Sequence, residues 1–217
     1  MKKIILAILF LVLFVGVAHA EIVVILDKSG SMDSIKTDVI GSFNGFLAGQ
    51  KAHGEWQNFT LILFNDSHES KTANIKEFEP LDCETYNPSG MTALYDAIGE
   101  TIKSLEDRLE PSTKAIIAII TDGKENSSTE FDAAEIKKLI KHYEKWHFWK
   151  FIYLAANQDE FEEGAKIGIV PNNIYSIDVS TSLGVSNTFH TLTNAIKEKP
   201  TDSNEPVDHS AKTSPPK

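Results

Sequence analysis

Oxygen-bearing side chains follow directly after an apolar run near the start of the sequence. Asp27, Ser29 and Ser31 occupy alternate positions after Ile22–Leu26, a run typical of a buried strand. One carboxylate and two hydroxyls that face a crevice suit a hard divalent cation such as Mg²⁺ or Mn²⁺, rather than zinc or copper. The pattern alone also fits a strand that ends in a turn, in which the serine hydroxyls bond to the backbone.

Two distant segments carry further oxygen donors and favour the metal site. Thr92 closes the loop Pro88–Thr92, which opens a helical pattern, and Asp122 follows the apolar run Ala115–Ile120. Open α/β sheets bind ligands where strands end and helices begin. We therefore expect the three segments to meet at one edge of a sheet and to share a cation.

With these three segments the sequence resembles the von Willebrand factor A (vWA) family, and the segments resemble its metal-ion-dependent adhesion site (MIDAS). The resemblance runs from about residue 21 to residue 196. All the expected metal donors are present, and they are Asp27, Ser29, Ser31, Thr92 and Asp122. The resemblance implies that the two serines and the threonine contact the metal directly, while the aspartates act largely through water.

The resemblance also implies what the cation does. Neutral hydroxyl ligands leave much of the charge of Mg²⁺ or Mn²⁺ uncompensated, so a carboxylate from a partner can fill an open position on the ion. The two aspartates, which act through water, orient the hydroxyls and the waters. The family's usual partner is accordingly a protein or peptide that presents Asp or Glu. The loop 123–128 borders the predicted site and is expected to shape the choice of partner.

Apolar runs alternate with helical periodicities along the chain. This alternation predicts an α/β fold with three layers (α/β/α) and a doubly wound, mostly parallel sheet that has one short antiparallel edge strand. Strands are predicted at 22–26, 59–64, 72–78, 115–120, 151–155 and 174–179. Helices are predicted at 35–46 with Asp33 or Ser34 as the cap, at 94–109, at 136–143, from 157 onward and at 185–196.

The amino-terminal residues predict export. Lys2 and Lys3 precede an apolar stretch over 4–17 and a small-x-small ending at Ala18–Ala20, which is the pattern of a secretory signal peptide over residues 1–20. An uncleaved membrane anchor is the alternative, but an anchor needs about 20 apolar residues. It would also leave no linker before the first strand.

We therefore expect a vWA domain over 21–198 and, because Pro, Ser, Thr, Asp and Lys dominate afterwards, a disordered tail over 199–217. The protein is expected to be periplasmic or secreted, with no stable membrane insertion after cleavage.

Charge argues against nucleic acid as a partner. Removing Lys2 and Lys3 from the 21 basic residues leaves 19 against 31 acidic ones, a net charge of −12. An acidic protein attracts nucleic acid or anionic membranes only through a local basic patch, and none is apparent in the sequence.

Two further features are predicted to be structural. The single cysteine, Cys83, excludes an intramolecular disulfide and is expected to be a small buried side chain, with a reactive thiol or an intermolecular bridge as the alternative. Trp146, Phe148, Trp149 and Phe151 are expected to pack in the core and at its rim rather than to form a ligand cage.

The sequence lacks the residues that the enzymatic alternatives require. A phosphatase of the haloacid dehalogenase type needs a second Asp two positions after Asp27, where this chain has Ser29. A nucleophile elbow and a Walker loop are absent from the sequence. The predicted function is therefore an exported, cation-dependent protein-binding module for adhesion or assembly, not an enzyme. A metal-dependent hydrolase, and a structural domain that the cation merely stabilises, are the alternatives.

Overall fold

A central sheet organises the chain, and the computed structural model describes residues 20–197 except for 55 and 157. The strands of this part are β1 Ala20–Asp27, β2 Asn58–Phe64, β3 His68–Asn74, β4 Lys114–Thr121, β5 Trp149–Ala155 and β6 Ile174–Ser176. Their order is β3-β2-β1-β4-β5-β6, with β3 antiparallel to β2 and the other pairs parallel. The predicted doubly wound sheet with one antiparallel edge strand is confirmed.

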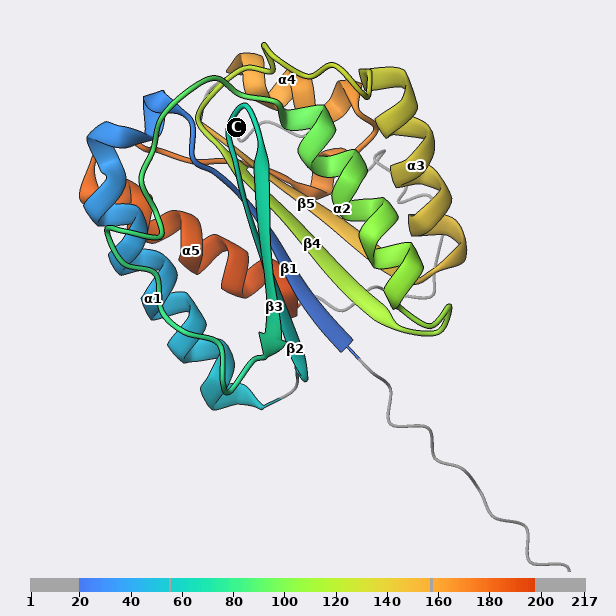
Figure 1. Ribbon diagram of the computed structural model, residues 1–217, viewed down its shortest axis with the longest axis horizontal. Helices are drawn as coiled ribbons and strands as arrows, with labels where there is room; N and C mark the ends of the chain where they lie inside the picture. The colour runs from blue at the N-terminus through green and yellow to red at the C-terminus, as the bar shows by residue number, and fades with distance from the viewer. Residues whose placement is uncertain (1–19, 55, 157, 198–217) are drawn as a thin grey trace, which may run out of the picture.

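Helices cover both faces of the sheet, as the three-layer prediction requires. They are α1 Lys36–His53, α2 Leu94–Arg108, α3 Ala133–Trp146, α4 Gln158–Lys166 and α5 Ser182–Lys197, with short 3₁₀ helices η1 Gly30–Ile35 and η2 Pro171–Asn173. Figure 1 shows α1 and α5 on one side of the sheet and α2, α3 and α4 on the other. The predicted signal peptide and tail lie outside the described residues, apart from Ala20 at the start of β1.

Alternate residues of the central strands feed two separate cores. Ile22, Val24 and Leu26 of β1 belong to the core beneath α1 and α5, whereas Val23 and Ile25 belong to the core beneath α2 and α3. All of these side chains are fully buried. A strand covered on both faces must be apolar at every position, which explains the uninterrupted runs in the sequence.

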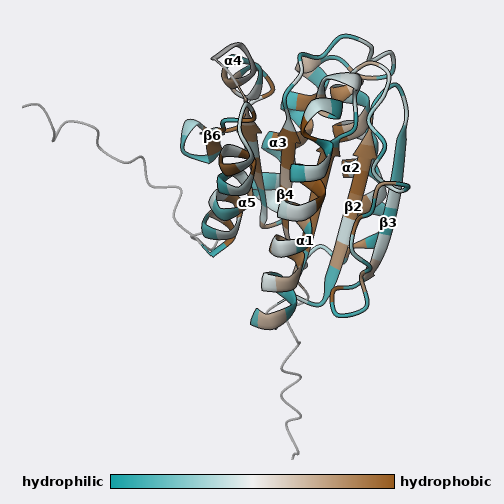
Figure 2. Cartoon of the chain, turned by 90° about the vertical axis from the view of Figure 1, so that its left-hand side faces the viewer, coloured by the Kyte–Doolittle hydropathy of each residue, from teal (hydrophilic) through white to brown (hydrophobic). Residues whose placement is uncertain are grey.

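The edge strand lies earlier than the sequence predicts. β3 occupies His68–Asn74 rather than 72–78, and all its residues but one are exposed. Because neither face of β3 is covered, hydrophobic alternation could not locate it; Figure 2 shows its hydrophilic colour beside the apolar β2. The apolar residues that suggested a strand are buried after it, and the ring of Phe78 lies 4.7 Å from that of Phe59.

Two predicted boundaries are wrong. Asp33 and Ser34 do not cap α1, because both lie within η1, and the cap residue Ile35 makes no side-chain bond. η1 continues directly into α1, so a 3₁₀ turn of the backbone precedes the first residue of the helix where a capping side chain was expected. The last strand ends at Ser176 rather than at Val179.

Cys83 is exposed, so the prediction of a buried side chain is wrong. It sits in a turn built around Asp82, whose Oδ1 accepts the backbone N–H groups of Glu84 and Thr85 at 3.0 and 2.8 Å. The turn is closed by these polar contacts, and it holds Cys83 in solvent.

The aromatic group at the α3–β5 junction divides between core and surface. Trp149 and Phe151 are buried as predicted, whereas Trp146 and Phe148 are mostly exposed.

A buried ion pair joins elements at the amino edge of the sheet. Glu21 is only 1% exposed. Arg108, at the end of α2, donates to the two carboxylate oxygens of Glu21 at 2.7 and 2.6 Å. The Thr60 hydroxyl donates to Glu21 Oε1 at 2.5 Å. The pair therefore connects β1, β2 and α2 at the edge opposite the predicted metal donors.

Candidate metal centre at the carboxyl edge of the sheet

Asp27 is the last residue of β1 and is completely buried. Its Oδ1 accepts the N–H of Ser29 at 2.6 Å, and its Oδ2 accepts the hydroxyl of Thr121 at 2.6 Å. Thr121 ends β4, the neighbour of β1 at the point where the chain crosses from one half of the sheet to the other. Such switch points are where open α/β sheets hold ligands.

Ser29, Ser31 and Asp122 form a row from the interior to the solvent. The two serine Oγ atoms lie 3.1 Å apart, and the Ser31 hydroxyl donates to Asp122 Oδ1 at 2.6 Å. Ser29 is buried, Asp122 is half-buried and Ser31 is exposed. The row therefore leads from Asp27 to a surface that a ligand can reach.

Thr92 is buried just before α2, and an asparagine from a distant loop holds its backbone. The Thr92 N–H donates to Asn126 Oδ1 at 2.9 Å, and the Thr92 carbonyl accepts the Asn126 N–H at 3.1 Å. This two-way contact ties the loop after β4 to the start of α2, so that Thr92 and Asp122 come to the same edge of the sheet.

Backbone contacts also tie the Thr92 loop to the Asp27 loop. Gly30 N–H donates to the carbonyl of Gly90 at 3.1 Å, and Ser89 N–H donates to that of Lys28 at 2.9 Å. Gly90 has a left-handed backbone with φ of 78°, a conformation that costs glycine least.

Gly123 marks the space that the donor oxygens share. A methyl group built on its Cα would lie 3.1 Å from Thr92 Oγ1, 3.5 Å from Ser31 Oγ and 3.7 Å from Asp27 Oδ2. Oxygens from two loops, 27–31 and 88–92, thus lie next to Gly123 on a third loop, and a methyl group there would crowd Thr92. A donor set made only of hydroxyl and carboxylate oxygens matches the ligands that small hard cations prefer.

The carboxyl groups of the site are costly to ionise when no cation is present. Burial raises the pKa of Asp27 to about 6, and the neighbouring charge of Asp122 adds a smaller rise, while hydrogen bonds from Thr121 and Ser29 oppose it. Burial likewise raises the pKa of Asp122. A cation would offset this cost. Among the described residues, no group of three or more His, Cys, Asp or Glu side chains is placed to hold a metal, and the predicted donors are mainly hydroxyls.

Sequence reasoning missed three supporting residues. Thr121 positions Asp27, Asn126 positions Thr92, and Tyr86 donates its buried hydroxyl to the carbonyl of Asp27 at 2.7 Å. Thr121 could have been found, because it directly precedes Asp122 at a strand end. Tyr86 and Asn126 lie far along the chain from their partners and carry no local signal.

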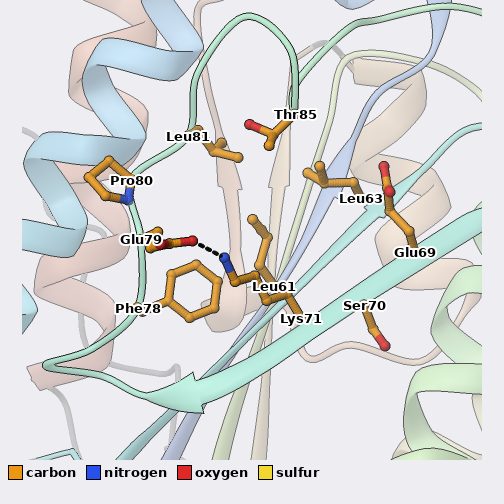
Figure 3. Close-up of a pocket in the computed structure, with 10 residues that line it drawn as sticks. All are labelled: Leu61, Leu63, Glu69, Ser70, Lys71, Phe78, Glu79, Pro80, Leu81 and Thr85. Atoms are coloured by element: carbon orange, nitrogen blue, oxygen red, sulfur yellow. Dashed lines mark hydrogen bonds and ion pairs between the residues drawn. The ribbon is translucent and has the colours of Figure 1, made fainter.

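A separate cavity lies between β2, β3 and the loop 78–85 (Figure 3). It has a volume of about 140 Å³ and is lined by Leu61, Leu63, Glu69, Ser70, Lys71, Phe78, Glu79, Pro80, Leu81 and Thr85. Figure 3 shows the apolar side chains gathered around the space and Lys71 paired with Glu79, at 2.7 Å. None of the predicted metal donors lines it.

No family model matches the sequence, and no curated protein matches it. Solved structures do. The pilus adhesin SpaC of Lactobacillus rhamnosus GG superposes with a TM-score of 0.63 at 15% identity over 84% of this chain and 30% of its own. Proximal thread matrix protein 1 from the mussel byssus, with a zinc-occupied MIDAS motif, gives 0.61 at 15% identity over 82% and 48%.

Two other matches cover more of their own chains. Manganese-loaded Plasmodium vivax TRAP has a TM-score of 0.55 at 16% identity over 80% of this chain and 74% of its own. The SpRpn10 VWA domain gives 0.55 at 12% identity over 80% and 95%. The chain has the vWA fold. It spans about half of the mussel protein and under a third of the pilus adhesin.

The described part of this vWA fold contains no helix long and apolar enough to cross a membrane.

Proposed function

We propose that this vWA domain is an exported protein-binding module whose partner supplies a carboxylate to a divalent cation, Mg²⁺ or Mn²⁺, at the carboxyl edge of the sheet. Ser29, Ser31 and Thr92 would contact the ion, and Asp27 and Asp122 would act mainly through water. The observation that carries the proposal is the region beside Gly123, where oxygens of the 27–31 and 88–92 loops converge. The metal-occupied MIDAS motif of the mussel protein and the manganese-loaded TRAP support a divalent cation on this fold.

The chemistry of the site favours binding over catalysis. When bound, the cation would supply a Lewis-acidic position for a carboxylate from a partner. Asp27 already uses one oxygen for the Ser29 N–H and the other for the Thr121 hydroxyl, so neither is directed at a substrate. The pilus adhesin among the structural matches supports the same function.

Metal binding is tested by calorimetry with MgCl₂. We expect about one equivalent, bound with modest affinity because few charges touch the ion. Asp27→Ala or Thr92→Ala should abolish the binding while the circular dichroism of the fold remains. Asp33→Ala removes an exposed carboxylate close in sequence to Ser31 and serves as the matched control. Unchanged Mg²⁺ binding in both site variants would refute the assignment.

The bridging role is tested on partners captured from envelope and extracellular material. A true partner should dissociate in EDTA and return with Mg²⁺ or Mn²⁺, and Ca²⁺ should replace them less well because it prefers more ligands at longer distances. Removing the acidic side chain of the partner, and changing Thr92 to Ala, should each cost a few kcal/mol. The two losses should not add, because they break the same contact. Binding that persists in EDTA would favour the structural alternative instead.

A further inference from the structure

The junction of α3 and β5 exposes two large aromatic side chains. Trp146 is 63% exposed and Phe148 is 50% exposed. Phe148 also has a left-handed backbone with φ of 54°. A bulky side chain in that conformation is strained, so the fold holds an aromatic group in water at a conformational cost. Neither residue takes part in the candidate metal centre, which lies at the other edge of the sheet.

Lysines surround these aromatic groups on α3. The segment 137–150 has five lysines and a single glutamate, although the whole chain has a net charge of −10. Lys138, Lys141 and Lys145 are exposed and recur at helical spacing on one face. Lys145 Nζ lies 4.7 Å from the ring centroid of Trp146. The expectation from the sequence that the chain has no local basic patch is therefore wrong.

The point where the chain enters the domain lies at the same edge. Ala20 of β1 pairs with Lys114 of β4, and the next residue of β4 pairs with Trp149 of β5. Two strand spacings separate Ala20 from Phe148, about 10 Å between their backbones. The exposed aromatic groups therefore lie at the amino edge of the sheet, where β1 begins. In Figure 1, β1 enters at the lower end of the sheet, the amino edge.

We propose that the surface made of Lys138, Lys141, Lys145, Trp146 and Phe148, here called the basic aromatic surface, docks on the anionic headgroup layer of a bilayer. Tryptophan, phenylalanine and lysine together are the side chains that settle at a membrane interface. Glu106, which accepts the Tyr143 hydroxyl, and Asp107 flank this surface from α2, so its charge is local and the aromatic groups are needed as well. No membrane insertion is involved.

Docking at this edge gives the molecule an orientation. The basic aromatic surface lies at the amino edge of β4 and β5, and the candidate metal centre lies at the carboxyl edge of β1 and β4. A domain held on a membrane by the basic aromatic surface would turn the candidate metal centre away from that membrane. The cation would then face a partner on another surface. The membrane docking itself goes beyond the proposed function and does not depend on it.

The test uses the full-length protein as expressed, mixed with phosphatidylcholine vesicles that either contain or lack phosphatidylglycerol. Lys138→Gln, Lys141→Gln and Lys145→Gln form one triple variant. The control triple variant changes the exposed lysines Lys71, Lys76 and Lys103, with the same loss of charge. Contact by the surface itself is read from quenching of Trp146 by brominated acyl chains, taken as the difference from Trp146→Phe.

We expect sedimentation with the anionic vesicles, Trp146 quenching, and a loss of affinity on the order of a hundredfold in the first triple variant only. Three results would overturn the proposal. One is no binding to anionic vesicles. Another is an equal loss in both triple variants, which would show attraction by charge alone. The third is binding without Trp146 quenching, which would show that another part of the protein contacts the vesicles.

Discussion

At the scale of residues, the candidate site depends on a position that has no side chain. Gly123 lies where oxygens of Thr92, Ser31 and Asp27 converge. Gly123→Ala should weaken Mg²⁺ binding in calorimetry, because a methyl group 3.1 Å from Thr92 Oγ1 would crowd that hydroxyl and shift it from the ion. Gly45→Ala is the control, since a methyl there meets nothing within 4 Å and should stabilise α1 by up to about 1 kcal/mol. Retained metal binding in Gly123→Ala would mean that the ion, if bound, lies elsewhere.

Tyr86 acts on the site through the backbone of Asp27. Its hydroxyl is buried and donates to the Asp27 carbonyl at 2.7 Å. Tyr86→Phe should destabilise the protein by about 1–2 kcal/mol, because a buried carbonyl loses its partner. It should also weaken Mg²⁺ binding, as measured by calorimetry well below the melting temperature. A variant that loses stability but binds Mg²⁺ normally would limit Tyr86 to a structural role.

At the scale of elements, the Glu21–Arg108 pair joins β1 to α2. Glu21 is buried and Arg108 is about one-third exposed. Arg108→Ala should lower the free energy of unfolding by about 3 kcal/mol, because it leaves a buried carboxylate unpaired. The double variant Glu21→Gln/Arg108→Ala should lose less in urea unfolding, since no charge is left behind. Equal losses would show that packing of the arginine stem, not its charge, matters.

α3 carries a carboxyl group with an unusual titration. Burial raises the pKa of Glu144 from 4.5 to about 7, and a hydrogen bond from the Phe151 backbone opposes the rise only in part. The folded state therefore binds a proton more tightly than the unfolded state. The contribution of Glu144 to stability should be fully present below pH 4.5. It should be lost, by on the order of 1–3 kcal/mol, as the pH rises to about 7.

The Glu144 contribution can be isolated by unfolding the protein at a series of pH values in saturating Mg²⁺. Glu144→Gln cannot ionise, so the difference between wild type and variant should slope between pH 4.5 and 7 and be flat above. A flat difference throughout would assign the pH dependence to other groups.

At the scale of the whole molecule, export from the cytoplasm remains a prediction. Expressed with its leader in a bacterium, the protein should appear outside the cytoplasm and begin at Glu21. β1 starts at Ala20, so cleavage there would remove one strand residue and leave Glu21 paired with Ala115. Terminal sequencing that finds intact Met1 in a membrane fraction would favour the anchor alternative.

The sequence by itself determined the order of the elements and which oxygen-bearing side chains stand at the candidate site. Strands buried on both faces must be apolar throughout, so β1, β4 and β5 were predictable, and the oxygens of Asp27, Ser29 and Asp122 stand where those strands end. β3 was misplaced, because a strand exposed on both faces has no hydrophobic alternation to detect.

Only the tertiary structure decided which residues support the site and which surfaces form. Tyr86 and Asn126 reach the donor loops across long stretches of chain, and no local pattern encodes such contacts. The basic aromatic surface also depends on the tertiary fold, because the packing at the α3–β5 junction buries Trp149 and leaves Trp146 and Phe148 exposed. Periodicity reports which side of an element is buried. Contacts between elements are set by how the layers pack.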